Sequence, residues 1–258
     1  MNIGFSTGSL ALGDFKKAIK MLEGKSVNAI ELSSLREEEL PQLIAHIDYL
    51  DLKKYNHISF HAPSKLVHLN ERELVHILLQ VAAKKWSIII HPDIISDPKE
   101  WRILGQYLCI ENMDKRKPIG RTTKDLEEIF DNLPEASFCL DIAHAKQIDP
   151  TMMEAYLMLK KFERRLKQIH VSDVNSQSNH ESLNFDALFA YKKISSIIPK
   201  DIPIILESPV TENKINLEIK LASLIFENKE FLKFIDKSSI DFNPYSQIIK
   251  QSRDLELV

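Results

Sequence analysis

Short apolar runs alternate along the chain with longer segments in which apolar residues recur every three or four positions. Eight such runs stand out, and most lack the alternation of polar and apolar residues that a half-exposed strand shows. Continuous runs of this kind indicate strands that are buried on both faces. The predicted strands are Ile3–Ser6, Ala29–Leu32, Ile58–His61, Ser87–His91, Leu108–Glu111, Ser137–Asp141, Gln168–Val171 and Ile202–Glu207.

Amphipathic segments with helical spacing fill the intervals between these runs. Strands that alternate with helices predict a parallel sheet, and eight repeats in 258 residues predict an α/β fold, a single-domain (β/α)8 TIM barrel. We expect the barrel to span residues 1–234, with residues 235–258 as a C-terminal extension that packs on the barrel or makes an oligomer contact. The predicted helices are Phe15–Leu22, Glu71–Ala83, Thr123–Phe130, Thr151–Leu166 and Phe185–Ile197.

Composition agrees with a globular protein that has one sizeable core. Hydrophobic residues make up 44% of the chain and charged residues 28%. A net charge of −3 gives no general attraction to nucleic acid, although it does not exclude a local basic groove.

Cys109 and Cys139 lie in apolar runs, which favours buried thiols and a reducing, cytoplasmic location. The sequence shows no signal peptide and no apolar stretch of about 18 residues that would span a membrane.

Ionisable side chains end almost every predicted strand. Active sites of TIM barrels lie at the carboxyl ends of the strands, where the following loops gather. Every run except the first carries a histidine or an acidic residue at or next to this end. These residues are Glu31, His61, His91, Glu111, Asp141, His170 and Glu207.

A ring of carboxylates at one barrel mouth needs a cation. Without one, the carboxylates repel each other and their pKa values rise. Imidazole together with carboxylate suits Zn²⁺, Mn²⁺, Co²⁺ or Fe²⁺, and several histidines argue against a plain Mg²⁺ or Ca²⁺ site. We therefore predict a divalent-metal enzyme that binds Zn²⁺ or Mn²⁺, with one to three ions.

Six segments, taken in order, resemble the xylose isomerase-like TIM barrel superfamily over roughly residues 1–230. This superfamily contains sugar isomerases and epimerases and also the endonuclease IV type of AP endonuclease. The Leu-Asp-x-x-His-Ala and His-x-x-Asp motifs, followed by a glutamate on the last strand, are specific in combination. The segments are Phe60-His61-Ala62-Pro63, His91-Pro92, Ile110-Glu111-Asn112-Met113, Leu140-Asp141-Ile142-Ala143-His144-Ala145, His170-Val171-Ser172-Asp173 and Leu206-Glu207-Ser208-Pro209.

The resemblance implies a metal site that both branches share, made by Glu111, Asp141, His170 and Glu207. In the sugar branch this set would bind one metal, and the two glutamates would flank the substrate carbon as acid and base. His61 and His91 would then bind substrate hydroxyls or line the pocket.

In the endonuclease IV branch the resemblance implies further metals. His61 and His91 would hold a second ion with Glu111 as the bridge, and His144 and His180 would help to hold a third. The sequence departs from this branch at three places. Ser178 stands where the third site should have an aspartate, Ser64 replaces a tyrosine, and the glycine expected after His180-Glu181 is absent.

Several other polar residues have structural interpretations. Glu31 is expected to orient a histidine rather than bind metal, and Asp173 to accept backbone N–H groups. The segment Lys115-Arg116-Lys117 is expected to form a solvated loop, whereas Arg121 is a candidate for binding a substrate phosphate. The remaining histidines, His46, His57, His68 and His76, lie away from the carboxyl ends of the strands and are expected to be structural or solvated.

The sequence therefore predicts an isomerase or epimerase that acts on a small sugar or sugar phosphate. Glu111 and Glu207 would transfer the proton, and His144, His61 and Arg121 would bind the substrate. The alternative is an AP endonuclease-type phosphodiester hydrolase with two or three ions. The departure at Ser178 and the lack of a basic surplus favour the sugar. A non-catalytic scaffold is disfavoured because the ionisable strand ends are retained.

Overall fold

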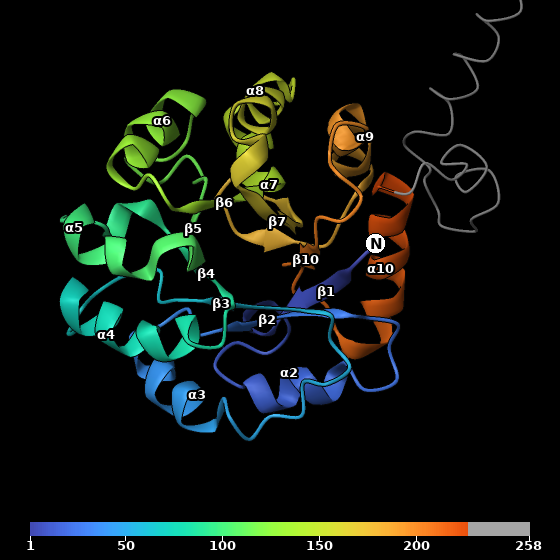
Figure 1. Cartoon of the computed structure of the whole chain (residues 1–258). Coiled ribbons are helices and arrows are strands. Elements are labelled where there is room, and N and C mark those ends of the chain that lie inside the picture. The colour runs from blue at the N-terminus through green and yellow to red at the C-terminus, as the bar shows by residue number, and fades with distance from the viewer. Residues whose placement is uncertain (227–258) are drawn as a thin grey trace, which may run out of the picture. The chain divides into compact units, whose positions relative to one another are not determined.

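Eight parallel strands close into a barrel in the computed structural model, which describes residues 1–226. Each strand from β1 to β7 pairs with the next one in the chain, and β10 closes the ring between β7 and β1. The strands lie inside a ring of helices (Figure 1), so the predicted (β/α)8 fold is confirmed. The barrel strands are β1 (Ile3–Ser6), β2 (Ala29–Ser33), β3 (His57–His61), β4 (Ser87–Ile90), β5 (Leu108–Glu111), β6 (Ser137–Asp141), β7 (Leu166–Val171) and β10 (Ile204–Leu206).

The connections between strands carry the helices and one small hairpin. The hairpin pairs β8 (Asp173–Val174) with β9 (His180–Glu181) in antiparallel fashion. The α-helices are α1 (Thr7–Leu10), α2 (Phe15–Met21), α3 (Leu40–His46), α4 (Glu71–Ala82), α5 (Pro98–Trp101), α6 (Thr123–Asn132), α7 (Ile142–Ile148), α8 (Met153–Lys161), α9 (Phe185–Ser195) and α10 (Ile215–Phe226). Short 3-10 turns span Glu37–Glu39, Pro92–Ile94, Arg102–Tyr107, Glu163–Arg165 and Glu212–Lys214.

The helix predicted over Thr151–Leu166 is shorter at both ends. Met152 adopts a left-handed backbone with φ of 71°, so the helix begins at Met153, two residues after its predicted start. The helix ends at Lys161, and β7 already begins at Leu166. The prediction was wrong here because the apolar spacing of α8 continues without a break into the buried β7 strand.

Apolar side chains fill the layer between the barrel and its helices. Phe138 on β6 packs edge-on against Phe130 of α6 with ring centroids 6.1 Å apart, and Phe162 after α8 contacts both rings. Trp101 is fully buried, and its indole N–H donates to the Glu71 carboxylate at 2.6 Å. Trp101 therefore packs α5 against α4.

Two sequence-based expectations concern the chain as a whole. The extension predicted for residues 235–258 lies outside the residues that the structure describes. Within residues 1–226, no helix is both long enough and apolar enough to cross a membrane.

Gly4 lies where β1 meets β2 and leaves no room for a side chain. A Cβ atom at this position would stand 1.8 Å from the carbonyl oxygen of Ala29. We expect Gly4→Ala to destabilise the barrel by at least about 3 kcal/mol, the upper end of typical overpacking costs, because the obstacle is backbone. Chemical denaturation with urea would measure the free energy of unfolding.

Gly24→Ala provides the comparison for this prediction. Gly24 has a left-handed φ of 68°, but a Cβ atom there would meet nothing within 4 Å. The variant should lose only about 1 kcal/mol from backbone strain. Equal losses in the two variants would contradict the close contact between β1 and β2.

Candidate metal centre at the barrel mouth

The predicted strand-end residues meet at one end of the barrel because all the strands run in the same direction. Ser33 pairs with His61 and Asp141 with His170, so neighbouring strands end at nearly the same height. Eight side chains converge there in three groups, and within each group the candidate ligand atoms lie within 4.8 Å of one another. The first group is His61, His91 and Glu111; the second is Glu111, Asp141, His170 and Glu207; the third is Asp141, His144 and His180.

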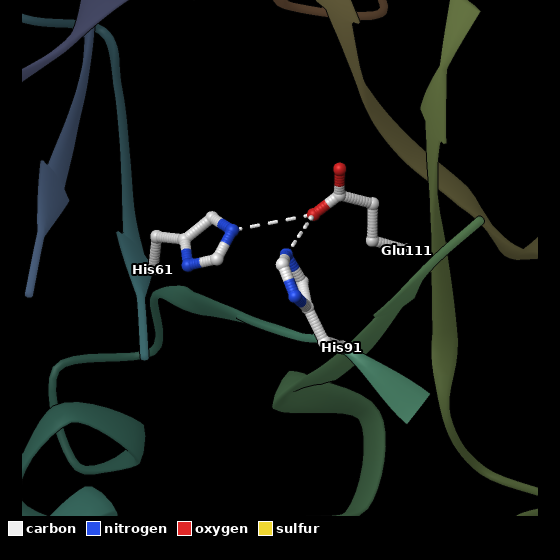
Figure 2. A group of neighbouring side chains, drawn as sticks. All are labelled: His61, His91 and Glu111. Carbon is white, nitrogen blue, oxygen red and sulfur yellow. Dashed lines mark hydrogen bonds and ion pairs between the residues drawn. The ribbon is translucent and has the colours of Figure 1, made fainter. Parts of the chain in front are cut away.

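Glu111 is the common partner of the histidines. Its Oε2 atom lies 3.2 Å from Nε2 of His61 and 3.4 Å from Nε2 of His91, as Figure 2 shows. Its Oε1 atom lies 3.4 Å from Nδ1 of both His144 and His170. One carboxylate that is only 1% exposed thus faces four imidazole rings.

His61 is held in a fixed orientation by the backbone beside it. Its Nδ1–H donates to the carbonyl oxygen of Ala62 at 2.8 Å, which turns Nε2 toward Glu111. Histidines that bind metal commonly donate their second ring N–H in this way. The orientation of His61 therefore suits a ligand in the first group.

The second group is built around His170 and two glutamates. Nδ1 of His170 lies 3.4 Å from Oε1 of Glu111 and 3.4 Å from Oε2 of Glu207. Asp141 stands at the end of the neighbouring strand, and its Oδ1 atom accepts the backbone N–H of His144, which starts α7. The other oxygen of Asp141, Oδ2, is free to face the centre.

The third group forms although its expected aspartate is a serine. His144 Nδ1 lies 3.4 Å from Asp141 Oδ2, and the rings of His144 and His180 are 5.3 Å apart. The β8–β9 hairpin carries His180, and Ser172 fixes its ring through an Oγ–Nδ1 contact of 2.7 Å. Ser178 instead donates its hydroxyl to Gln147 at 2.7 Å and takes no part in the group. Asp141 supplies the carboxylate.

The charges of this cluster shift its pKa values in opposite directions. Burial raises the pKa of Glu111, but the charge of His170 and hydrogen bonds from His61 and His91 outweigh it, so the pKa lies well below its ordinary value. Burial raises the pKa of Glu207 well above its ordinary value despite the attraction of His170, and repulsion from Glu111 adds to the rise. Burial also lowers the pKa of His180 to about 4, which keeps this ring neutral and able to bind metal.

The donor set fits a divalent cation. Asp141 Oδ2, His170 Nδ1 and His91 Nδ1 are buried and have no hydrogen-bond partner among the described residues. Buried polar atoms are normally paired. His170 Nδ1 faces Glu111 and Glu207 of the second group, and Asp141 Oδ2 faces His144 of the third group. A cation bound by the carboxylates and imidazoles would satisfy these two atoms, and the mixture of nitrogen and oxygen donors suits a divalent metal ion.

The two cysteines contribute no ligand to these groups. Cys109 and Cys139 are both buried and free, and with Ile89 they form an apolar cluster. Burial raises the pKa of Cys109 to about 12 and that of Cys139 well above its ordinary value, so both remain protonated thiols. Thiols in this state are poor metal ligands.

Asn112 is a site residue that the sequence did not single out. It is fully buried, its amide group donates to the carbonyl of Asp141 at 2.9 Å, and it accepts the N–H of Asp141 at 2.8 Å. Its own carbonyl accepts Nδ1–H of His144 at 3.0 Å. Asn112 thus clamps the ends of β5 and β6 together. Its only signal in the sequence is its position directly after Glu111.

Asp173 does not have its expected role, whereas the expected role of Arg121 is not tested by the contacts of this residue. The Asp173 carboxylate accepts from the side chains of Lys146, at 2.8 Å, and of Asn184, instead of the expected backbone N–H groups. Arg121 belongs to none of the three groups, and its backbone N–H donates to Asp125 at 2.9 Å. Its role in binding phosphate stays a prediction.

Two basic residues of the loop after β5 are paired with carboxylates, one from the same loop and one from the turn after β4. Arg116 makes a two-pronged hydrogen bond to Asp114, at 2.8 and 2.9 Å. Lys117 lies 2.6 Å from the carboxylate of Asp93. The segment Lys115-Arg116-Lys117 was expected to form a solvated loop. The side chain of Arg116 is 51% exposed, as expected, whereas that of Lys117 is only 13% exposed.

Comparison with known proteins gives matches at the level of structure. No protein-family model and no curated protein sequence matches the chain. The structure of endonuclease IV from Thermus thermophilus superposes with a TM-score of 0.60 at 15% identity, over 88% of this chain and 99% of that one. A putative sugar phosphate isomerase/epimerase from Anabaena variabilis superposes with a TM-score of 0.53 at 16% identity, over 85% and 87% of the two chains.

A third solved structure, SacUVDE, superposes with a TM-score of 0.51 at 14% identity, over 89% of this chain and 100% of that one. All three likenesses extend over most of both chains. These likenesses show that the chain shares a barrel fold with these three proteins, which agrees with the (β/α)8 fold predicted from the sequence.

Proposed function

We propose that the chain is a divalent-metal-dependent phosphodiester hydrolase whose centre holds two or three ions. The observation that carries this proposal is the sharing of ligands between groups. Glu111 belongs to the first and second groups, and Asp141 belongs to the second and third. Groups that share a carboxylate hold their ions side by side, which is the arrangement that phosphate-cleaving enzymes use.

Divalent ions in such a centre act as Lewis acids that activate water and neutralise charge on a phosphate group. The chain itself contributes the orientation of the ligands and the exclusion of water around them. The side chains of His180 and His91 are 30% and 14% exposed, whereas those of His61 and His170 are almost fully buried. A substrate therefore reaches the centre from the side of His91 and His180.

The substrate class that we propose is a phosphodiester in a nucleic-acid backbone. The superposed protein from Thermus thermophilus is an endonuclease, which supports this class. The main argument from sequence against it was Ser178 in place of an aspartate. That argument loses weight because Asp141 provides a carboxylate for the third group.

A second candidate is an isomerase or epimerase that acts on a small sugar or sugar phosphate. The observation in its favour is the pair Glu111 and Glu207, which both lie 3.4 Å from His170 and whose pKa values are pushed in opposite directions. Paired carboxyls with split pKa values suit base and acid roles in proton transfer. This reaction would use the second group alone, and His144, His61 and Arg121 would contact the substrate.

The number of bound ions tests the shared-ligand centre. We expect protein purified without chelator to contain two or three ions of Zn²⁺ or Mn²⁺ per chain by elemental analysis. Glu111→Gln removes the charge from two groups, so this variant should retain at most one ion. Glu218→Gln is the matched control, because Glu218 is equally buried but lies on α10, where it accepts the backbone N–H of Leu183. A wild-type protein with a single ion would contradict the multi-ion centre.

Activity on two classes of substrate separates the two candidate reactions. We expect cleavage of a duplex that contains an abasic site and no conversion of a panel of ketoses and ketose phosphates. His91→Ala should slow the cleavage roughly 100-fold or more, since an ion that neutralises phosphate charge contributes several kcal/mol.

The exposed His76 on α4 supplies the control, and His76→Ala should leave cleavage unchanged. Sugar conversion by the wild type that persists in His91→Ala would overturn the hydrolase proposal. That pattern would instead support the isomerase, which does not need the first group.

A further inference from the structure

A network of polar side chains crosses the interior of the barrel directly beneath the metal centre. Glu31 on β2 is fully buried, and its Oε2 atom accepts from Gln168 Nε2 at 2.7 Å and from Ser59 Oγ at 3.2 Å. The same oxygen lies 3.0 Å from Nε2 of His170. β2 and β7 are separated in the barrel by β1 and β10, so these contacts span the interior.

The partners of His170 determine which ring nitrogen carries its proton. A neutral imidazole has one N–H, and a carboxylate can only accept a hydrogen bond. Nε2 of His170 has two close polar neighbours, the Glu31 carboxylate at 3.0 Å and the amide nitrogen of Gln168 at 2.8 Å. Because the Gln168 amide already donates to Glu31 at 2.7 Å, we assign the proton to Nε2, from which it is donated to the same carboxylate. Nδ1 then keeps its lone pair, faces Glu111 and Glu207 at 3.4 Å each, and has no hydrogen-bond partner among the described residues.

A second layer of contacts fixes Glu31 in turn. The amide oxygen of Gln168 accepts Nε2–H of His57 at 3.0 Å, and this contact turns the amide NH₂ group toward Glu31. Ser59 donates to Glu31 from β3. His57 lies at the first residue of β3, at the opposite end of the strand from His61. The network thus runs through the barrel from His57 at its bottom to His170 at its mouth.

We propose that Glu31 is a positioning residue that presents Nδ1 of His170 to the ion of the second group. Carboxylates that accept the second N–H of a metal-binding histidine fix its tautomer and raise its basicity as a ligand. This role rests on the proposed metal centre and deepens it. Glu31 belongs to none of the three groups of candidate ligands, and its Oε2 atom is instead shared among Ser59, Gln168 and His170.

The competing explanation is that Glu31 and His170 form a purely structural ion pair. Substitution of Glu31 would then change only the stability of the fold. A positioning role predicts two further results. His170 has a defined tautomer in the metal-loaded protein, and the protein binds metal more weakly when the Glu31 carboxylate is lost. Both can be measured without any enzyme activity.

The first experiment compares Zn²⁺ binding by the full-length wild type, Glu31→Gln and Ser59→Ala in competition with a chromogenic chelator. We expect Glu31→Gln to bind one of its Zn²⁺ ions 10- to 100-fold more weakly than the wild type does, which is the usual effect of losing such a partner of a metal-binding histidine. Ser59→Ala removes a hydrogen bond to the same oxygen but leaves His170 in contact with Glu31, so its affinity should stay within about twofold of wild type. Equal affinity in the wild type and Glu31→Gln would overturn the positioning role and leave the proposed function intact.

The second experiment does not use Glu31→Gln and so does not depend on the folding of that variant. Long-range ¹⁵N–¹H correlation spectra of ¹⁵N-histidine-labelled, Zn²⁺-loaded protein report which ring nitrogen is protonated. The His170 signals are assigned by their loss in His170→Gln. We expect a protonated Nε2 and a metal-bound Nδ1, and a proton on Nδ1 would overturn the proposal. A wild type that binds no Zn²⁺ at all would overturn the metal centre itself, which separates the two failures.

Discussion

The structure of the barrel mouth depends on one buried carboxylate. Glu111 is almost completely withdrawn from water, yet its oxygens lie within 3.4 Å of nitrogens from four histidines. An isolated buried charge is costly, and it is tolerated only where partners surround it. These partners come from β3, the end of β4, α7 and β7, so the carboxylate is satisfied only when the barrel is closed in the correct register. The fold and the site therefore specify each other.

The strands could be predicted from sequence with good accuracy because they are buried on both faces. β1, β5 and β6 have the predicted bounds. Helix ends were harder, since they depend on single backbone angles such as that of Met152, which an apolar pattern does not encode. The short helix α7 was not predicted at all. Asp141 is the N-cap of this helix, and its side chain also faces the metal centre. The segment from Asp141 to Ala145 was therefore interpreted as a metal-binding motif and not as the start of a helix.

The residues of the candidate site were also visible in the sequence, but their grouping was not. A strand-end pattern identifies which side chains reach the mouth, whereas only the geometry shows that Asp141 belongs to both the second and third groups. This sharing is why Ser178 does not remove the third group. The sequence also predicted that Glu31 orients a histidine. It did not show that this histidine is His170 or that Gln168 takes part, because the contacts join strands that are not neighbours in the barrel.

The overall negative charge of the chain does not oppose a nucleic-acid substrate once the centre is considered. The three groups contain three carboxylates, from Glu111, Asp141 and Glu207, while their histidines are neutral when they bind metal. Two divalent ions carry more positive charge than these carboxylates carry negative charge. In the proposed centre the ions therefore set the local potential, as bound cations commonly do. The attraction of a phosphate to the mouth would come from the ions. The formal net charge of −3 counts the three carboxylates of the site but no bound ion, so it does not describe the potential at the mouth.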